Sequence, residues 1–291
     1  MGFTIKELET LTGIKAHTIR IWEQRYRFLR PSRTSTNIRT YNNEELKTLL
    51  TVALLNKYGY KISRIDGMDA EQRHREVLQL GYDDANQEHL VNELIGCMID
   101  LEATGFTRHI DRYLQRHGLE QTITGLVFRF LEKTGILWQT GRVNPAHEHV
   151  VSNIIRQKII AAIEGLPLAD GGSPLLLLLL PEGEFHELGL LYVSYLLRRR
   201  GLPVLYIGAN TPLKDTLYVA NFKKPAFIYM HLTAVHHKPH FQRFLQGLAT
   251  GAPDVKVLLS GYVALDQPKA VGENIVLLQS LSAVHTYISE I

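Results

Sequence analysis

The chain has 291 residues, enough for two or three domains, and its 45% hydrophobic and 21% charged residues are typical of a globular protein. We recognise no signal peptide, and the leucine run at 175–180 is too short to cross a bilayer. The single Cys97 excludes an intramolecular disulfide framework and a multi-thiolate metal site. We therefore expect a cytoplasmic protein with no membrane partner.

The formal net charge of +3 is unevenly distributed along the chain. Residues 1–41 hold eight Lys and Arg against three acidic side chains, a net charge of +5, so the rest of the chain carries −2. A basic head on a slightly acidic body predicts that the head binds a polyanion.

The head has the pattern of two short helices around a turn. Thr4 can cap a helix over 5–11, Gly13 makes the turn, and a second helix begins near Lys15. The second helix of such a pair enters the major groove of DNA, and the polar loop at 31–41 is typical of a wing. The predicted DNA contacts are Lys15, His17, Thr18, Arg20, Arg25, Tyr26, Arg33, Arg39 and Tyr41.

The same residues carry a family resemblance. We find a similarity to the winged helix-turn-helix of the MerR family of transcription regulators in TIKELETLTGIKAHTIRIWEQRY, followed by RTYNNEEL. The resemblance covers about the first seventy residues and implies a recognition helix at 15–25, a wing at 31–41 and double-stranded operator DNA as the partner. Composition alone leaves a helical cap with a solvated basic face as the alternative.

A helical region follows the head. Apolar residues at helical spacing over about 77–165 predict a four-helix bundle. Within it, Trp138 is followed after nine residues by Glu148 and His149, a set that core packing could also explain. The combination resembles the signature of cobalamin-sensing MerR proteins, the CarH and LitR photoreceptors. That resemblance implies that these three residues cover the upper face of the corrin and its adenosyl group.

The last part of the chain alternates apolar strands with helices. Strands at 175–180 and 204–208, and the segments AFIYMHL and VKVLLS, alternate with helices at about 187–200 and 213–223, which predicts a parallel, Rossmann-like α/β sheet. Ligands bind such sheets at the carboxyl ends of the strands, where PEGEFHELG stands.

The arrangement of Glu184, His186 and Gly189 resembles the lower-ligand loop of cobalamin-binding domains. The resemblance implies that His186 is the lower axial ligand of cobalt, that Glu184 orients its ring, and that Gly189 lets the loop approach the corrin. The nucleotide tail normally passes a small Ser and a Gly-Gly pair. Here the Ser position falls on His231 or Thr233, the Gly-Gly position reads Ser260-Gly261, and Gln139 stands where light-sensing members often have His.

The sequence thus predicts a multidomain protein. We expect a winged helix-turn-helix at 1–75, a four-helix-bundle cap domain at 77–165 and a Rossmann-like cobalamin-binding domain at 172–291. The expected function is a non-enzymatic, homodimeric or homotetrameric transcription regulator, a repressor, controlled by adenosylcobalamin and by light. Two alternatives stay open: a regulator that has lost cobalamin and answers to a protein partner or another ligand, and, with less support, a corrinoid methyltransferase subunit.

Overall fold

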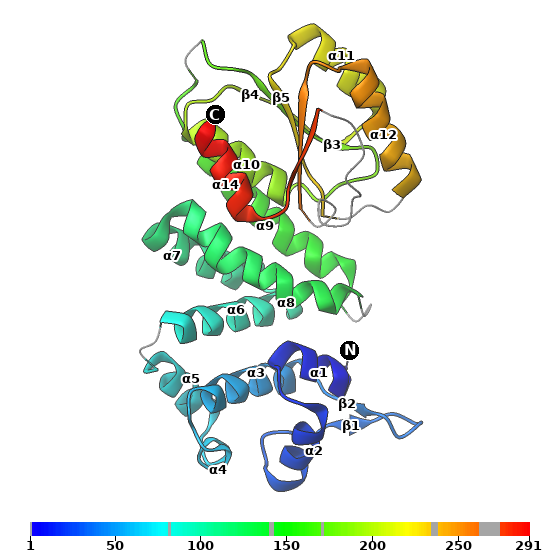
Figure 1. The fold of residues 1–291 in the computed structure, drawn as a ribbon. Coiled ribbons are helices and arrows are strands. Elements are labelled where there is room, and N and C mark those ends of the chain that lie inside the picture. The colour runs from blue at the N-terminus through cyan, green and yellow to red at the C-terminus, as the bar shows by residue number, and fades with distance from the viewer. Residues whose placement is uncertain (1, 81–82, 140–142, 170–171, 234–237, 262–273) are drawn as a thin grey trace. The chain divides into compact units, whose positions relative to one another are not determined.

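The computed structural model describes residues 2–80, 83–139, 143–169, 172–233, 238–261 and 274–291. They fold into two compact units, Met1–Ile154 and Ile155–Ile291 (Figure 1). Each helix in this part of the chain is too short or too polar to cross a membrane.

The first unit contains the winged helix-turn-helix and the helical segment. Its elements are α1 (Ile5–Thr12), α2 (Ala16–Arg25), β1 (Ser32–Arg33), β2 (Arg39–Thr40), α3 (Asn43–Lys57), α4 (Ile62–Asp66), α5 (Ala70–Leu78), α6 (Asp83–Ile99), α7 (Ala103–Gln121), the π-helix η1 (Thr122–Val127), α8 (Phe128–Gln139) and the start of α9 (Pro145–Glu164). Strands β1 and β2 pair antiparallel and form the wing. The predicted helix-turn-helix is confirmed.

Local signals begin and end α1. The backbone N–H of Thr4 donates to Glu7 Oε2 at 2.6 Å, and the N–H of Glu7 donates to Thr4 Oγ1 at 3.4 Å, which completes a capping box. Gly13 ends the helix at φ 74°, in the left-handed region that favours glycine. Leu8 of α1 and Ile19 of α2 are fully buried, so the two helices share a core.

The helical segment of this unit is built around α6, which packs against α3, α5, α7 and α8. Gly118, at φ 73°, interrupts the end of α7, and the wider turn of η1 then leads into α8. The rings of Phe106 and Phe130 meet edge to face, with centroids 5.3 Å apart. The helical region that the apolar spacing predicts is therefore present.

The second unit, which begins within α9, is a parallel sheet between helices. Its further elements are β3 (Leu176–Pro181), α10 (Leu188–Arg199), β4 (Val204–Thr211), α11 (Leu213–Lys223), β5 (Phe227–His231), α12 (Lys238–Gly251), β6 (Lys256–Ser260), β7 (Ile275–Leu278) and α14 (Leu281–Glu290). In Figure 1, α10 and α14 cover one face of the sheet, and α11 and α12 cover the other. Every residue of β3 is buried, which explains why the leucine run has no polar alternation.

The strand order β4-β3-β5-β6-β7, with every pairing parallel, places a topological switch point between β3 and β5. The chain leaves β3 toward β4 on one side and leaves β5 toward β6 on the other. A crevice opens at the carboxyl ends of two such strands. The loop that contains His186 follows β3, and His231 ends β5, so both predicted site residues lie at the carboxyl ends of these two strands.

Candidate functional site

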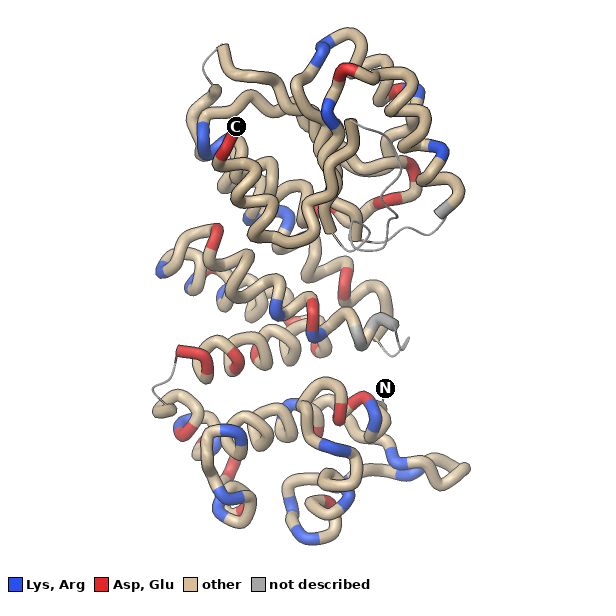
Figure 2. Tube along the Cα trace, viewed as in Figure 1, with Lys and Arg blue, Asp and Glu red and all other residues tan. Residues whose placement is uncertain are grey.

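The second helix of the head has a buried side and an exposed side. Ile19 and Trp22 are buried, whereas His17, Arg20 and Arg25 are exposed. Figure 2 shows basic side chains, all of them arginines, along α2 and the loop after it. Among the other predicted DNA contacts, Lys15 and Arg33 are exposed, and Thr18, Tyr26 and Arg39 are half-buried. A basic, exposed helix side beside a hairpin is a surface that a DNA duplex can approach.

Glu23 of α2 holds the base of the wing. Its carboxylate accepts from Arg39 Nε at 2.8 and 3.1 Å and from the Tyr41 hydroxyl at 3.2 Å. Arg39 is therefore tied to the recognition helix through one side of its guanidinium. At the tip of the wing, Arg33 Nη1 donates to Asn37 Oδ1 at 2.7 Å, and Asn37 has φ 63°, as a tight turn requires.

The structure corrects the prediction for Tyr41. Its side chain is fully buried, and its backbone pairs with that of Phe3 through N–H···O bonds of 2.7 and 2.9 Å. Burial and the charge of Glu23 raise the pKa of its phenol. Tyr41 is thus a core residue that joins the chain before α1 to the wing, and a buried ring does not contact DNA.

In the second unit, the loop after β3 is organised by one carboxylate. Glu184 Oε1 accepts from the backbone N–H of Phe185 and of His186, each at 2.8 Å, and lies 2.5 Å from Nδ1 of the His186 ring. Because an ionised carboxylate can only accept, Nδ1 carries the proton, and in the neutral ring Nε2 keeps its electron pair. Glu184 is 3% exposed, whereas the His186 side chain is 46% exposed. The pair has the form of a metal-binding imidazole oriented by a carboxylate.

Asn210 of the neighbouring strand β4 is hydrogen-bonded to this loop. Asn210, at φ 55°, accepts the Gly183 N–H on its side-chain oxygen at 2.9 Å and donates its own N–H to the Glu184 carbonyl at 3.0 Å. These reciprocal bonds fix the loop against the end of β4. The sequence analysis missed Asn210, for which the GANTP stretch after an apolar strand is the available signal.

A second support lies at the start of α10. Glu187 contacts Arg156 Nη2 at 3.2 Å and accepts from the Tyr206 hydroxyl at 3.2 Å. Burial raises the pKa of the Tyr206 phenol, and the Glu187 charge raises it further. The three residues join α9, β4 and α10 beside the His186 loop, and sequence reasoning missed them because they are far apart along the chain.

His231 occupies the path that the sequence analysis assigned to the nucleotide tail. Its Nδ1 lies 2.8 Å from Ser260 Oγ, which is also 2.5 Å from the Tyr229 hydroxyl. A Cβ added to Gly189 would lie 2.1 Å from the His231 ring, so the ring packs directly on that glycine. Burial lowers the pKa of His231 to about 4, an effect that the Glu184 charge partly offsets.

At Gly261, the second residue of the Gly-Gly position, the backbone conformation requires glycine. Its φ is 91°, and an added Cβ would lie 2.4 Å from the Leu232 carbonyl oxygen. Thr233, the alternative to His231 at the small-residue position, is exposed. The His186 loop thus presents an oriented imidazole that could bind a metal ion, and the His231 ring packs on Gly189 at the position where the resemblance expects a small side chain.

The predicted upper-face residues belong to the first unit. Glu148 and His149 lie in the first turn of α9, with 3.9 Å between Glu148 Oε2 and His149 Nδ1, and the His149 side chain is 71% exposed. Glu148 Oε1 also accepts from Ser152 Oγ at 3.3 Å. Trp138 and Gln139 end α8, but their side chains lie outside the described part of the chain.

Comparison with known proteins assigns families to three parts of the chain. Residues 3–72 match the MerR HTH family regulatory proteins, and residues 90–162 and 175–277 each match a B12 binding domain. The HTH-type transcriptional repressor CarA of Myxococcus xanthus is 28% identical over 93% of this chain and 90% of its own length. The repressor CarH of the same organism is 25% identical over 96% of this chain and 93% of its own.

A solved structure resembles a large part of the chain. The monomethylamine corrinoid protein of Methanosarcina barkeri superposes with a TM-score of 0.57 at 12% identity, over 70% of this chain and 100% of its own. At that identity the likeness shows a shared fold. The fold and the matches together define a MerR-type helix-turn-helix protein with B12-binding domains. The chain is a homologue of the CarA and CarH repressors.

The exposed wing arginine generates a first prediction. Replacing Arg33 with Ala should weaken binding to every duplex sequence about equally and lower the slope of log affinity against log salt by about 1, because one phosphate contact is lost. Titrations of labelled duplex at several salt concentrations measure the slope. Arg243→Ala, an exposed arginine of the second unit, is the control. A parental slope in Arg33→Ala would contradict the contact.

The buried imidazole generates a second prediction. Between pH 7 and pH 5 the unfolded chain protonates His231 near its ordinary pKa of 6.5, whereas the folded protein holds it neutral down to about 4. The unfolded state therefore binds more protons, and the free energy of unfolding should fall by about 2 kcal/mol on acidification. Urea unfolding at both pH values measures the loss. His231→Asn, which does not titrate, should lose less; an equal loss would contradict the buried, neutral ring.

Proposed function

We propose that this chain is a DNA-binding transcription regulator, a repressor, whose affinity for operator DNA depends on adenosylcobalamin. The observation that carries the proposal is the imidazole of His186, oriented by the buried Glu184 at the switch point of the sheet. A corrinoid carrier would use the same loop but has no need of a helix-turn-helix. We also propose the domain bounds expected from the sequence: the helix-turn-helix at 1–75, the cap domain at 77–165 and the cobalamin-binding domain at 172–291.

The residues of the second unit would hold the lower face of the cofactor. His186 would bind cobalt through Nε2, since Glu184 engages Nδ1. Gly189 would allow the corrin to come close, and His231 would have to turn away from Gly189 for the tail to pass Ser260.

The upper face would be covered by Trp138, Glu148 and His149. Adenosylcobalamin supplies a cobalt–carbon bond that light breaks. Trp138 would pack on the adenosyl group and favour it over a methyl group, since an aromatic contact adds about 1 kcal/mol beyond its buried area. Gln139 has no imidazole to offer cobalt once that group has left, so the illuminated protein would hold the corrinoid less firmly.

Control of DNA binding would follow from assembly. A ligand shifts an equilibrium only by its different affinities for the two states. In the dark, the cofactor would favour a homodimer or homotetramer that presents several helix-turn-helix heads to the operator. Loss of the adenosyl group would favour the separate chains, each with a single weak head.

A second candidate is favoured by the imidazole that fills the tail path. A regulator that has lost cobalamin, and that answers to a protein partner or another ligand, would tolerate His231 in its present position. An absorbance spectrum of the full chain after incubation with adenosylcobalamin and removal of excess separates the two. A bound corrinoid spectrum that changes on illumination supports the first candidate, and a colourless protein supports the second.

The axial ligand gives the third prediction. His186→Ala should lose the cobalt–histidine absorption and bind cobalamin at least about tenfold more weakly, and Glu184→Gln should weaken binding about 10–100-fold, because an oriented imidazole is a better ligand. Visible titrations of the full chain measure both changes. Glu182→Gln removes an exposed carboxylate of the same loop and should bind like the parent. Parental affinity in His186→Ala would overturn the assignment.

The tail path gives the fourth prediction. His231→Ser should raise the affinity for cobalamin about tenfold, because a small side chain opens the path, and should leave unchanged the affinity for cobinamide, which has no nucleotide tail. Parallel titrations with the two corrinoids measure the difference. If the substitution changes both affinities equally, or neither, His231 does not obstruct the tail.

A further inference from the structure

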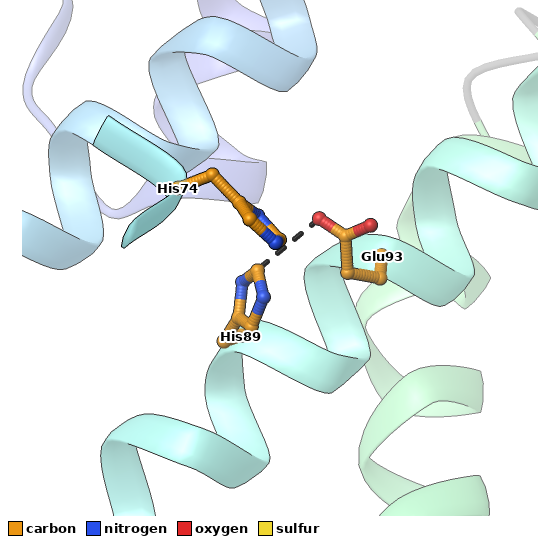
Figure 3. A group of neighbouring side chains, drawn as sticks. All are labelled: His74, His89 and Glu93. Atoms are coloured by element: carbon orange, nitrogen blue, oxygen red, sulfur yellow. Dashed lines mark ion pairs between the residues drawn. The ribbon is translucent and has the colours of Figure 1, made fainter. Parts of the chain in front are cut away.

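Three side chains that the proposed function does not use converge in the first unit. His74 lies on α5, and His89 and Glu93 lie one turn apart on α6. Their ligand atoms all lie within 4.8 Å of one another. Figure 3 shows His74 pointing from α5 toward the other two side chains. The His74 and His89 rings meet at 62° with centroids 5.2 Å apart, and Nδ1 of His89 is 3.9 Å from Oε1 of Glu93.

The three side chains lie at the wall of a cavity that a metal ion could enter. They line a cavity of about 1010 Å³, which His109 of α7 also lines. The His89 side chain is 12% exposed, and a neutral imidazole offers a ring nitrogen to a metal ion. Three cationic side chains, Arg112, Arg116 and Arg129, also line the cavity.

We propose that His74, His89 and Glu93 form a binding site for a divalent transition metal, with Zn²⁺ as the best chemical match. Two imidazoles and one carboxylate are a common zinc ligand set that leaves a fourth position for water or a further side chain. Imidazole ligands select against Mg²⁺ and Ca²⁺, which prefer oxygen. His109 of α7 lines the same cavity and is our candidate for the fourth ligand.

The distances allow the site to close. Tetrahedral zinc holds nitrogen at about 2.0–2.1 Å, so its ligand atoms lie about 3.4 Å apart. The ligand atoms here lie within 4.8 Å of one another, so the longest separation would have to shorten by about 1.4 Å, through rotation of the side chains. His74 is exposed and Glu93 has three rotatable bonds, so neither helix has to move for this approach.

The site lies where one family match ends and the next begins. His74 stands just beyond the match to the MerR family, and His89 and Glu93 stand where the first B12 binding match begins. A metal bound to all three would cross-link α5 to α6 and so restrain the helix-turn-helix head against the helical segment.

Metal binding is tested on the cobalamin-free full chain, so the result does not depend on the proposed function. Competition of Zn²⁺ between the protein and a coloured chelator should give about one site per chain, and Co²⁺, used as a spectroscopic probe, should show the intense visible absorption of a tetrahedral site. His74→Gln changes an exposed side chain, and Glu93→Gln keeps the size and shape of the side chain, so neither should disturb the fold. Each should weaken Zn²⁺ binding at least tenfold and abolish that absorption. His117→Gln, on α7 in the same cavity, is the matched control and should bind like the parent.

A second readout guards against misfolding. Zn²⁺ should raise the thermal unfolding temperature of the parent and of His117→Gln but not of His74→Gln or Glu93→Gln, because a ligand stabilises only the state that binds it. Unchanged Zn²⁺ affinity in both ligand variants, or equal loss in His117→Gln, would overturn the site. So would failure of the parent to compete with the chelator.

Discussion

The hydrogen bonds accepted by one oxygen atom of Glu184 fix the loop on which the proposed cofactor site of the second unit depends. That oxygen holds two backbone N–H groups and the His186 ring nitrogen in one arrangement, and the carboxylate itself is buried. A buried carboxylate is costly unless it is hydrogen-bonded, so loop shape and ring orientation are set together. Asn210 and Glu187 then attach the two ends of the loop to β4 and α9.

The parallel sheet gives this loop its place. Since β3 is an interior strand whose residues are all buried, a ligand is expected at its carboxyl end. The same topology brings His231, from the next strand in the sheet, onto Gly189. The switch point thus contains two different imidazoles. The His186 ring is exposed and oriented for a metal ion, whereas the His231 ring is packed against Gly189 in the neutral form.

The sequence predicted those parts of the structure that depend on neighbouring residues. The Thr4 capping box, the leucine strand and the position of His186 after a buried strand all follow from local patterns. Tyr41 was expected to contact DNA because it ends the predicted wing at 31–41, but its backbone pairs with Phe3, far away along the chain, and its ring is buried. The contact of His231 with Gly189 and the meeting of α5 with α6 were equally inaccessible, because each requires the packed fold.

The central claim is that corrinoid binding in the second unit governs DNA binding by the head. The most direct measurement is the affinity of the full chain for a duplex that it selects from a random pool, without cofactor, with adenosylcobalamin in the dark, and after illumination. Our account predicts tight binding only in the dark, cofactor-bound sample, with a return toward the cofactor-free value after light. Equal affinity in all three samples, with absorbance proving that the corrinoid was bound, would contradict it.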